Sequence, residues 1–343
     1  MAGIREVAAA AGVSTSTVSR VLSGNIPVAE STRDKVLEAV RLLDYYPNPM
    51  AQGLKGQSLK TIALIVPNVR DLVFPAAIKG IEDCARQAGY TLVLCNTDED
   101  FEREVFYIQN LRRRLIDGFI VSTARDDHRH LAELVGDKFP VVFLIRQPRG
   151  LRDANSVVLD NGDGGYQATK HLIGKGYRRI AIVSGDLDIE LYRERFEGYK
   201  RALAEAGLSL DDGLVVKRVS GWKESYQAMR EMLARGIVPE AVFATSDPKA
   251  IGIYRAIKDC GLCIPEDIAV VGFDNSDISS LMDPPMTTVA QPFYDMGARA
   301  CERLIRLIEG KRRTGPKTEV FPAHLVVRQS VRQGPAADGE MKI

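Results

Sequence analysis

The sequence has no long hydrophobic run. Apolar stretches such as residues 140–145 stop far short of the roughly 20 residues that a membrane-spanning helix needs. The N-terminus, with Arg5 and Glu6 near its start, has neither the apolar core nor the cleavage site of a secretory signal. Five cysteines, an odd number in 343 residues, argue against a disulfide framework and for a reducing compartment. These absences predict a cytoplasmic protein with no membrane partner.

An excess of charge of one sign is also missing. The chain has 46 Lys and Arg against 45 Asp and Glu, a net charge of +1. Residues 1–60 hold seven basic and five acidic residues, a weak bias in the direction expected for a nucleic-acid-binding segment. With 45% hydrophobic and 27% charged residues, the composition excludes wholesale disorder, and the length predicts two or three domains.

The sequence shows no catalytic constellation and no metal cluster. Its four histidines are not arranged as an acid–base set, and it has no P-loop, dinucleotide-binding glycine pattern or G-x-S-x-G elbow. Cys260 and Cys263 have the spacing of zinc ligands, but no second pair follows, so we interpret them as the end of a helix. We therefore expect no enzymatic activity, no metal and no cofactor.

Three short amphipathic helices are predicted at the N-terminus. Apolar residues with the period of one helix face begin the chain: Ile4, Val7, Ala8 and Ala11. Gly12 ends this helix, and Ser14 can cap a second helix that buries Val18. Residues 31–45 form a third amphipathic stretch. Two short helices joined by a glycine-containing turn are typical of a helix-turn-helix.

The second helix has a polar outward face. Its outward residues are short polar side chains and one arginine, namely Thr15, Ser16, Thr17, Ser19 and Arg20. Such a face can enter a major groove and donate to phosphates or base edges. In the alternative interpretation these are packing helices of a larger α domain, and the Ser and Thr side chains are only solvated.

Residues 47–59 are predicted to form a hinge. Asn48 and Pro49 suit the start of a short helix, but Gly53 and Gly56 each cost about 1 kcal/mol relative to Ala. A helix this short is expected to order only when something holds it.

The motifs of this region resemble those of the lactose-repressor (LacI/GalR) family of bacterial regulators. They are IREVAAAAGVSTSTVSRVLSG at residues 4–24, STRDKV at 31–36, and YPN at 46–48 followed by Ala51 and Leu54. The resemblance implies a set of residues at the operator: Thr15, Ser16, Thr17, Arg20 and Asn25, with Leu54 and Lys55 of the hinge in the minor groove. Gly3 and Gln52 replace the Thr and Arg usual in the family, which puts the first helix cap and the hinge contacts in doubt.

From residue 60 onward, strands and helices alternate. Apolar, β-branched runs predict strands at residues 61–66, 91–95, 118–121, 141–145, 156–159, 180–184, 214–219, 241–245 and 268–273. Helical periodicity occurs at residues 76–88, 101–114, 166–174 and 193–206. A repeat at an offset of 118 links Ile62, Gly80, Ala88 and Gly89 to Ile180, Gly198, Ala206 and Gly207. We expect two similar doubly wound α/β halves with a cleft between them.

This part resembles the periplasmic-binding-protein-like core of the same family. The matching motifs are Asp160-Asn161 and residues 176–181, 265–274 and 287–292. The predicted fold is thus an all-α helix-turn-helix head followed by an α/β core of two doubly wound subdomains. The predicted ranges are residues 1–46 for the head, 47–59 for the hinge, 60–331 for the core and 332–343 for a disordered tail.

Candidate effector-binding residues follow the predicted strands of the core. Loops at the carboxyl ends of parallel strands hold ligands, and the resemblance implies effector contacts at matching positions: Phe74, Arg195, Trp222, Asp247, Asp274 and Gln291. For each of them, a structural role such as an ion pair or a core edge is the alternative. Ile145 stands where sugar-responsive relatives often have Asp. The neighbouring Arg146 can meet a carboxylate or phosphate, or it is only solvated at the rim of the cleft. We expect a ligand that is less purely hydroxyl-based than a free sugar, or one that binds in a shifted pose.

These observations predict a homodimeric regulator of transcription, most simply a repressor. Its partners would be pseudo-palindromic double-stranded operator DNA and a small-molecule effector of the sugar, sugar-derivative or purine class. Control by a protein co-regulator is an alternative. A solute-binding protein fits less well because of the head.

Overall fold

The computed structural model describes residues 2–23, 27–45, 59–113, 116–123, 129–151, 154–311 and 317–333. The chain forms two compact units, Met1–Lys60 and Thr61–Ile343. Three predicted DNA-binding residues lie outside the described residues: Asn25, Leu54 and Lys55. Nearly all of the predicted hinge and most of the predicted tail lie outside them as well.

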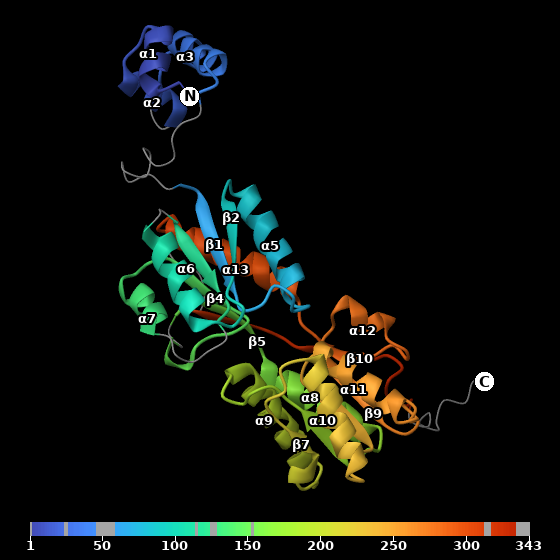
Figure 1. The fold of residues 1–343 in the computed structure, drawn as a ribbon. Coiled ribbons are helices and arrows are strands. Elements are labelled where there is room, and N and C mark those ends of the chain that lie inside the picture. Colours follow the sequence, from blue (N-terminus) through green and yellow to red (C-terminus); the bar gives the residue numbers. More distant parts are fainter. Residues whose placement is uncertain are drawn as a thin grey trace, which may run out of the picture. The chain divides into compact units, whose positions relative to one another are not determined.

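The described residues of the first unit form three helices, α1 (Ile4–Ala11), α2 (Thr15–Ser23) and α3 (Glu30–Leu42) (Figure 1). Their buried apolar side chains form one small core: Val7, Ala8, Ala11, Val18, Val36 and Ala39. Gly12 ends α1 in the left-handed conformation, as predicted, with φ of 65°. The third helix ends at Leu42 rather than at the predicted residue 45, because the chain turns at Asp44, whose φ is 45°.

The starts of α1 and α2 are capped by side chains. The Thr17 backbone N–H donates to Ser14 Oγ over 3.2 Å, as expected of an N-cap serine. Gly3 has no side chain to offer at the start of α1, but its own N–H donates to Glu6 Oε2 over 2.7 Å. A capping box has two hydrogen bonds, one to the side chain of the N-cap residue and one to the Glu three residues later. Glu6 supplies the second of these, and Gly3 cannot supply the first.

The second unit begins with a six-stranded parallel sheet in the order β11-β5-β4-β3-β1-β2. Its strands are β1 (Thr61–Val66), β2 (Thr91–Asn96), β3 (Gly118–Val121), β4 (Val141–Leu144), β5 (Ser156–Leu159) and β11 (Thr318–Phe321). Helices α5 (Phe74–Gln87) and α13 (Phe293–Ile308) cover one face, and α6 (Phe101–Arg113) and α7 (Arg129–Gly136) cover the other. Alternate residues of β1 serve the two faces: Ile62 and Leu64 pack with α5, and Ala63 and Ile65 with α6.

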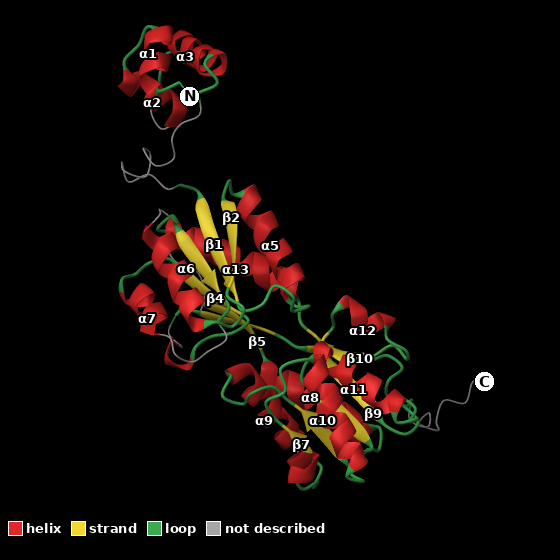
Figure 2. Cartoon of the chain, viewed as in Figure 1, coloured by secondary structure: helices red, strands yellow, loops and turns green. Residues whose placement is uncertain are grey.

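A second six-stranded sheet has the order β12-β10-β9-β8-β6-β7 (Figure 2). Its strands are β6 (Ile180–Val183), β7 (Val215–Val216), β8 (Ala241–Ala244), β9 (Ala269–Asp274), β10 (Thr287–Ala290) and β12 (His324–Val326), of which β12 alone is antiparallel to its neighbour. Helices α8 (Asn161–Gly174) and α9 (Glu190–Glu205) cover one face, and α10 (Trp222–Ala234) and α11 (Asp247–Asp259) cover the other. The short elements are α12 (Asp277–Leu281) and the 3₁₀ turns η1 (Arg149–Leu151) and η2 (Asp212–Leu214).

The repeat at an offset of 118 corresponds to these two sheets. Strand β1 occupies the same place in the first sheet as β6 in the second. A Cβ on Gly80 would collide with the carbonyl of Tyr294 in α13, and one on Gly198 would collide with the carbonyl of Gly162 in α8. Each glycine therefore lets two helices cross in close contact on one face of its sheet. The predicted pair of similar α/β halves is confirmed.

Several predicted boundaries are wrong, each for a local reason. The strand expected at residues 214–219 shrinks to Val215–Val216, since η2 takes Leu214 and Arg218 turns back with φ of 62°. Helix α8 starts at Asn161, before the predicted residue 166, because the Asp160 carboxylate accepts the Asp163 N–H over 2.8 Å. The helix end predicted at Cys260 is confirmed, as α11 stops at Asp259. None of the described helices is long and apolar enough to cross a membrane.

Replacing Gly80 by Ala is expected to lower the stability of the second unit by about 1–3 kcal/mol, because the new methyl must push α5 and α13 apart. The midpoint of urea unfolding of the full chain measures this loss. Gly174→Ala at the end of α8 is the control, since its Cβ would meet nothing within 4 Å. Equal midpoints for the two variants would contradict close packing at Gly80.

Candidate functional site

Helix α2 presents a polar face to solvent. Val18 is fully buried in the core of the head, whereas Ser16 and Arg20 are exposed. Because residues four apart are neighbours on a helix, Ser16 and Arg20 share the side that faces away from Val18. Of the other predicted residues, Thr15 is exposed and Thr17 is half-buried, its Oγ1 lying 2.9 Å from Ser14 Oγ.

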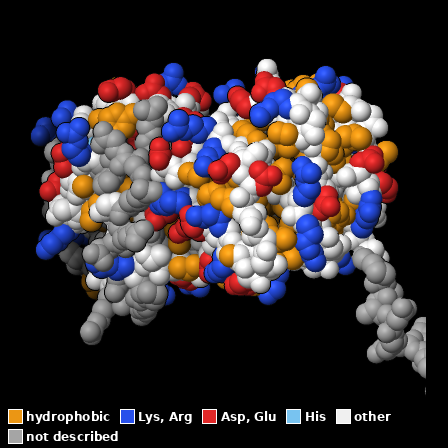
Figure 3. Space-filling model, turned by 90° about the horizontal axis from the view of Figure 1, so that it is seen from below, with side chains coloured by type: hydrophobic (Ala, Val, Ile, Leu, Met, Phe, Trp, Pro, Cys, Tyr) orange, Lys and Arg blue, Asp and Glu red, His pale blue; other side chains and the backbone are white. Residues whose placement is uncertain are grey.

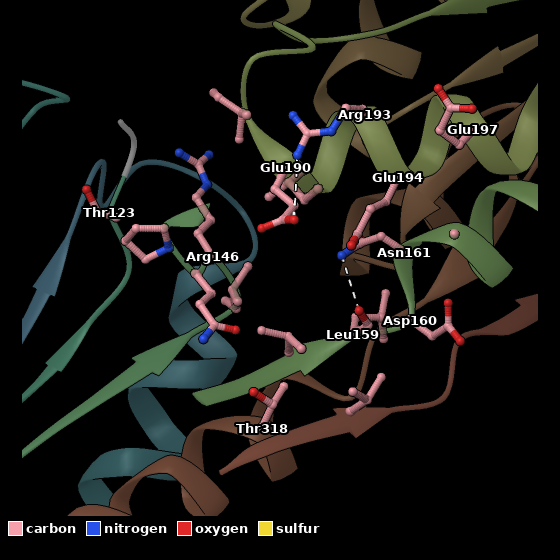
Figure 4. Close-up of a pocket in the computed structure, with 18 residues that line it drawn as sticks. Thr123, Arg146, Leu159, Asp160, Asn161, Glu190, Arg193, Glu194, Glu197 and Thr318 are labelled. Atoms are coloured by element: carbon pink, nitrogen blue, oxygen red, sulfur yellow. Dashed lines mark hydrogen bonds and ion pairs between the residues drawn. The ribbon is translucent and has the colours of Figure 1, made fainter. Parts of the chain in front are cut away.

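Two of the cavities in the second unit adjoin each other. The larger has a volume of about 570 Å³ (Figure 4) and the smaller about 240 Å³. Both are lined by Ile145, Arg146 and Leu191. Residues of both sheets' subdomains contribute to each, so a ligand in either would touch both halves of this unit.

The walls of the smaller cavity come from the carboxyl ends of parallel strands. From the first subdomain, Asn68 follows β1, Glu99 follows β2 and Arg146 follows β4. From the second, Ser246 follows β8, Asp274 ends β9 and Gln291 follows β10. This is where doubly wound sheets bind ligands, because the loops there lie outside the hydrogen-bonded strands.

Six of the seven predicted effector residues line the smaller cavity: Phe74, Arg146, Arg195, Trp222, Asp274 and Gln291. Phe74 is buried at the start of α5, and Trp222 is 50% exposed at the start of α10. Asp247 is not among the lining residues. Its carboxylate accepts hydrogen bonds of 2.8 Å from the Ser276 N–H, the Ser276 hydroxyl and the Thr288 hydroxyl.

Burial shapes the ionisation of both carboxyl groups on this side. Desolvation raises the pKa of Asp247 to about 6, against the lowering effect of its hydrogen bonds from Thr288 and Ser276. Burial also raises the pKa of Asp274 well above its usual value, while the positive charge of Arg195 opposes that rise.

Arg195 connects three elements behind the cavity. Its Nε donates to Asn161 Oδ1 over 2.9 Å, and its Nη1 donates to the Thr245 carbonyl over 2.6 Å. The same Nη1 lies 3.9 Å from Asp274 Oδ1, and the guanidinium carbon lies 3.6 Å from the centre of the Phe273 ring. Gln291 Nε2 donates to Asp274 Oδ1 over 2.6 Å. The arginine thus ties the start of α8 and the ends of β8 and β9 together.

The larger cavity carries charges of both signs. In Figure 4 Arg146 lies across this space from Glu194 and Asn161. The Arg193 guanidinium forms an ion pair with Glu190 over 3.5 Å. Burial, and next the charge of Glu190, raise the pKa of Glu194. Over the surface drawn in Figure 3, Lys and Arg side chains are likewise interspersed with Asp and Glu.

Two polar residues at the smaller cavity are not predicted from the sequence, Tyr192 and Lys249. Tyr192 lines the cavity, and the ammonium group of Lys249 lies 3.4 Å from its hydroxyl. A signal for Lys249 exists, since it shares the buried helix face of Gly252, Ile253 and Ala256, at the i, i+3, i+4, i+7 spacing. In the part of the chain that the structure describes, no cluster of His, Cys, Asp and Glu could hold a metal ion.

Comparisons with known proteins match both units. The family described as bacterial regulatory proteins, lacI family, matches residues 3–48, and the periplasmic binding protein-like domain matches residues 169–331. Catabolite control protein A from Priestia megaterium is 34% identical, with 96% of this chain and 99% of that protein covered. The HTH-type transcriptional repressor PurR from Vibrio atlanticus is 36% identical, with 97% and 99% covered.

Solved structures of similar regulators also match the chain in fold. A lac repressor dimer bound to operator and the anti-inducer ONPF has a TM-score of 0.85 and 30% identity, covering 96% of this chain and 98% of that one. A CelR–cellobiose complex has a TM-score of 0.73 and 33% identity, covering 96% and 100%. The family consists of regulators rather than enzymes. The chain therefore belongs to the LacI family of DNA-binding transcriptional regulators, with a helix-turn-helix head and an effector-binding core.

Proposed function

We propose that this regulator is a repressor that binds a pseudo-palindromic operator as a homodimer, and that a small molecule in the cavities of the core controls the binding. The operator-bound lac repressor dimer supports the two-fold arrangement, because a two-fold protein pairs with two half-sites. A regulator of genes would work beside the chromosome, in the bacterial cytoplasm. The head would span residues 1–46, the hinge 47–59 and the core 60–331.

In this proposal α2 enters the major groove. Thr15, Ser16 and Arg20 offer hydroxyl and guanidinium donors on its exposed side, which suits phosphates and base edges. Thr17 would contribute from the rim of this face. Asn25 and the hinge residues Leu54 and Lys55 would add contacts, with the hinge in the minor groove.

The observation that carries the control mechanism is a cavity whose walls come from both subdomains. The chain passes between the sheets three times, near residues 160, 291 and 322. Because so few chain segments connect the two halves, the halves can shift against each other. A ligand that binds one arrangement more tightly shifts the equilibrium by its difference in affinity, and thereby alters how the heads are presented. We infer a sugar, a sugar derivative or a purine as the effector.

Arg20→Ala is expected to weaken operator binding by about 10- to 100-fold, the effect of one good contact to a base or phosphate. A gel shift at fixed salt measures it, on the duplex that the wild-type protein selects from a random pool. Arg41→Ala on α3 is the control, because it removes the same charge from another exposed position of the head. Equal losses for Arg20 and Arg41 would leave only non-specific electrostatics and would contradict the assignment of α2.

A further inference from the structure

The guanidinium of Arg146 is not satisfied by the protein. It forms neither a hydrogen bond nor an ion pair with any residue of the described ranges, and its Nη1 is buried with no hydrogen-bond partner. Arg146 follows β4 and lines both cavities. A buried charged donor without an acceptor is unfavourable, so this position favours a ligand that brings an acceptor.

A second cation lies directly behind the cavity wall. Lys249, in the first turn of α11, is fully buried. Its Nζ lies 3.1 Å from Ser246 Oγ and 3.4 Å from the Tyr192 hydroxyl, and 4.5 Å from the centre of the Tyr192 ring. Among the described residues no carboxylate forms an ion pair with it, although buried lysines are nearly always paired.

The positive charges of these residues affect the pKa of the Tyr192 hydroxyl. Burial alone would raise its pKa, but the charges of Lys249, Arg146 and Arg195 outweigh burial and lower it. Tyr192 and Ser246 both line the smaller cavity. A ligand group in contact with them is therefore within reach of the positive charge of Lys249.

The acidic groups nearby do not cancel this charge. Asp274 is matched by Arg195 and Gln291, and Asp247 is enclosed by hydroxyl and N–H donors. Glu99 and Arg70 line the cavity but are exposed to solvent, which screens them. In the lining of the smaller cavity Asp71 remains as one negative charge, against the positive charge of Arg146 and that of Lys249 behind the wall.

The rest of the cavity suits hydroxyl groups and an apolar ring face. Gln291 Oε1 is buried without a donor, and Asp274 presents a carboxylate beside it, so both can accept from ligand hydroxyls. Trp222 offers a half-exposed aromatic surface on the same cavity.

We propose that the effector is a small anionic polyol, a sugar acid or sugar phosphate, whose anionic group binds Arg146 and the Tyr192 hydroxyl in front of Lys249 and whose hydroxyls bind Asp274 and Gln291. This rests on the proposed function, in which the cavity is the effector site.

The test compares matched anions with a neutral sugar on the full-length protein. D-gluconate, D-glucuronate, D-glucose 6-phosphate and D-glucose are added at equal concentration and constant ionic strength, and the melting temperature is measured. We expect at least one anion to raise the melting temperature by several degrees and D-glucose to leave it unchanged. The rise in melting temperature with D-glucose 6-phosphate, compared with the rises with the two carboxylates, shows whether the site prefers a phosphate or a carboxylate.

Variants then locate the anion. Lys249→Met nearly keeps the length of the side chain and removes the charge. Arg146→Gln removes the charge at a half-exposed position, where the guanidinium has no partner among the described residues. Each is expected to raise the dissociation constant of the stabilising anion by about 10- to 100-fold in calorimetry. Lys258→Met is the control, since this exposed lysine of the same helix pairs with Asp283.

Two results would overturn the proposal. If D-glucose stabilises the protein as much as its acids do, the cavity remains the effector site but not one for anions. If none of the three anions stabilises the protein, or if Lys249→Met and Arg146→Gln bind the anion as wild type does, the assignment of these cations is wrong. Neither result touches operator binding through α2, which the Arg20→Ala experiment tests separately.

Discussion

Replacing Val18 by Asp is expected to abolish operator binding while the unfolding of the core stays unchanged. Val18 is fully buried in the six-residue core of the head. A unit of about 45 residues has a stability of only about 2–7 kcal/mol. Burying an unpaired carboxylate costs several kcal/mol, so the variant head is expected to unfold. Because the head and the core are separate compact units, the core should keep its fold.

A gel shift and a thermal melt of the same sample measure the two consequences. Leu37→Asp is the control, because it introduces the same charge in the same unit. Leu37 lies beside the buried Val36 in α3, but its own side chain is 43% exposed. It should leave the head folded and operator binding within a few-fold of wild type. A Val18→Asp protein that still binds operator would mean that the fold of the head does not depend on this core.

The sequence predicts the fold of the core well where strands are long and buried on both faces. Continuous apolar runs such as residues 61–66 are typical of strands that are covered by helices on both faces. The glycines at 80 and 198 recur because each half has the same close crossing of two helices. The short edge strands β11 and β12 are not predicted. Strand β11 is paired with β5, and the Ser156 hydroxyl donates to Thr318 Oγ1 across 162 positions of sequence, an interaction that local pattern does not contain.

In the candidate site, too, the positions that follow from local sequence can be predicted, whereas contacts with distant residues cannot. Asp274 and Gln291 can be placed from their positions at or after the ends of strands. Arg195 can be placed from the helix predicted at residues 193–206, although α9 begins earlier, at Glu190. Asp247 can be placed at the end of β8 in the same way, but the direction of its carboxylate depends on Ser276 and Thr288 from other loops. Lys249 is hidden for a further reason, since a lysine on a buried helix face contradicts the usual expectation that lysines lie at the surface.

The largest loss of core stability is expected from Arg195→Ala, about 3–5 kcal/mol at pH 8. Removing one partner of a buried ion pair leaves the other uncompensated, and here Asp274 is buried and loses its cation. Hydrogen bonds from Arg195 to Asn161 and Thr245 are lost as well. The free energy of urea unfolding of the full chain, measured at pH 5 and pH 8, gives the difference between variant and wild type.

The difference should grow as pH rises. Burial already holds the pKa of Asp274 above its unfolded value of about 3.8, so the folded state binds its proton more tightly, and stability falls as pH rises through the folded pKa. Without Arg195 that pKa rises further, because its positive charge no longer opposes burial. The carboxyl of the variant therefore keeps more of its proton at pH 5 than at pH 8, and the loss is smaller at pH 5. At pH 8 its ionisation is opposed by desolvation and by the charges of Asp247 and Asp71, without Arg195 to offset them.

A double variant separates the ion pair from the other bonds of Arg195. Arg195→Ala is added to Asp274→Asn and compared with Asp274→Asn alone, so that the Asp274 carboxyl is absent from both proteins. The loss caused by Arg195→Ala should then be the same at pH 5 and pH 8. The residual would measure the bonds to Asn161 and Thr245, which tie the start of α8 to the end of β8. A loss by Arg195→Ala alone that does not change with pH would mean that Asp274 is not the group it neutralises.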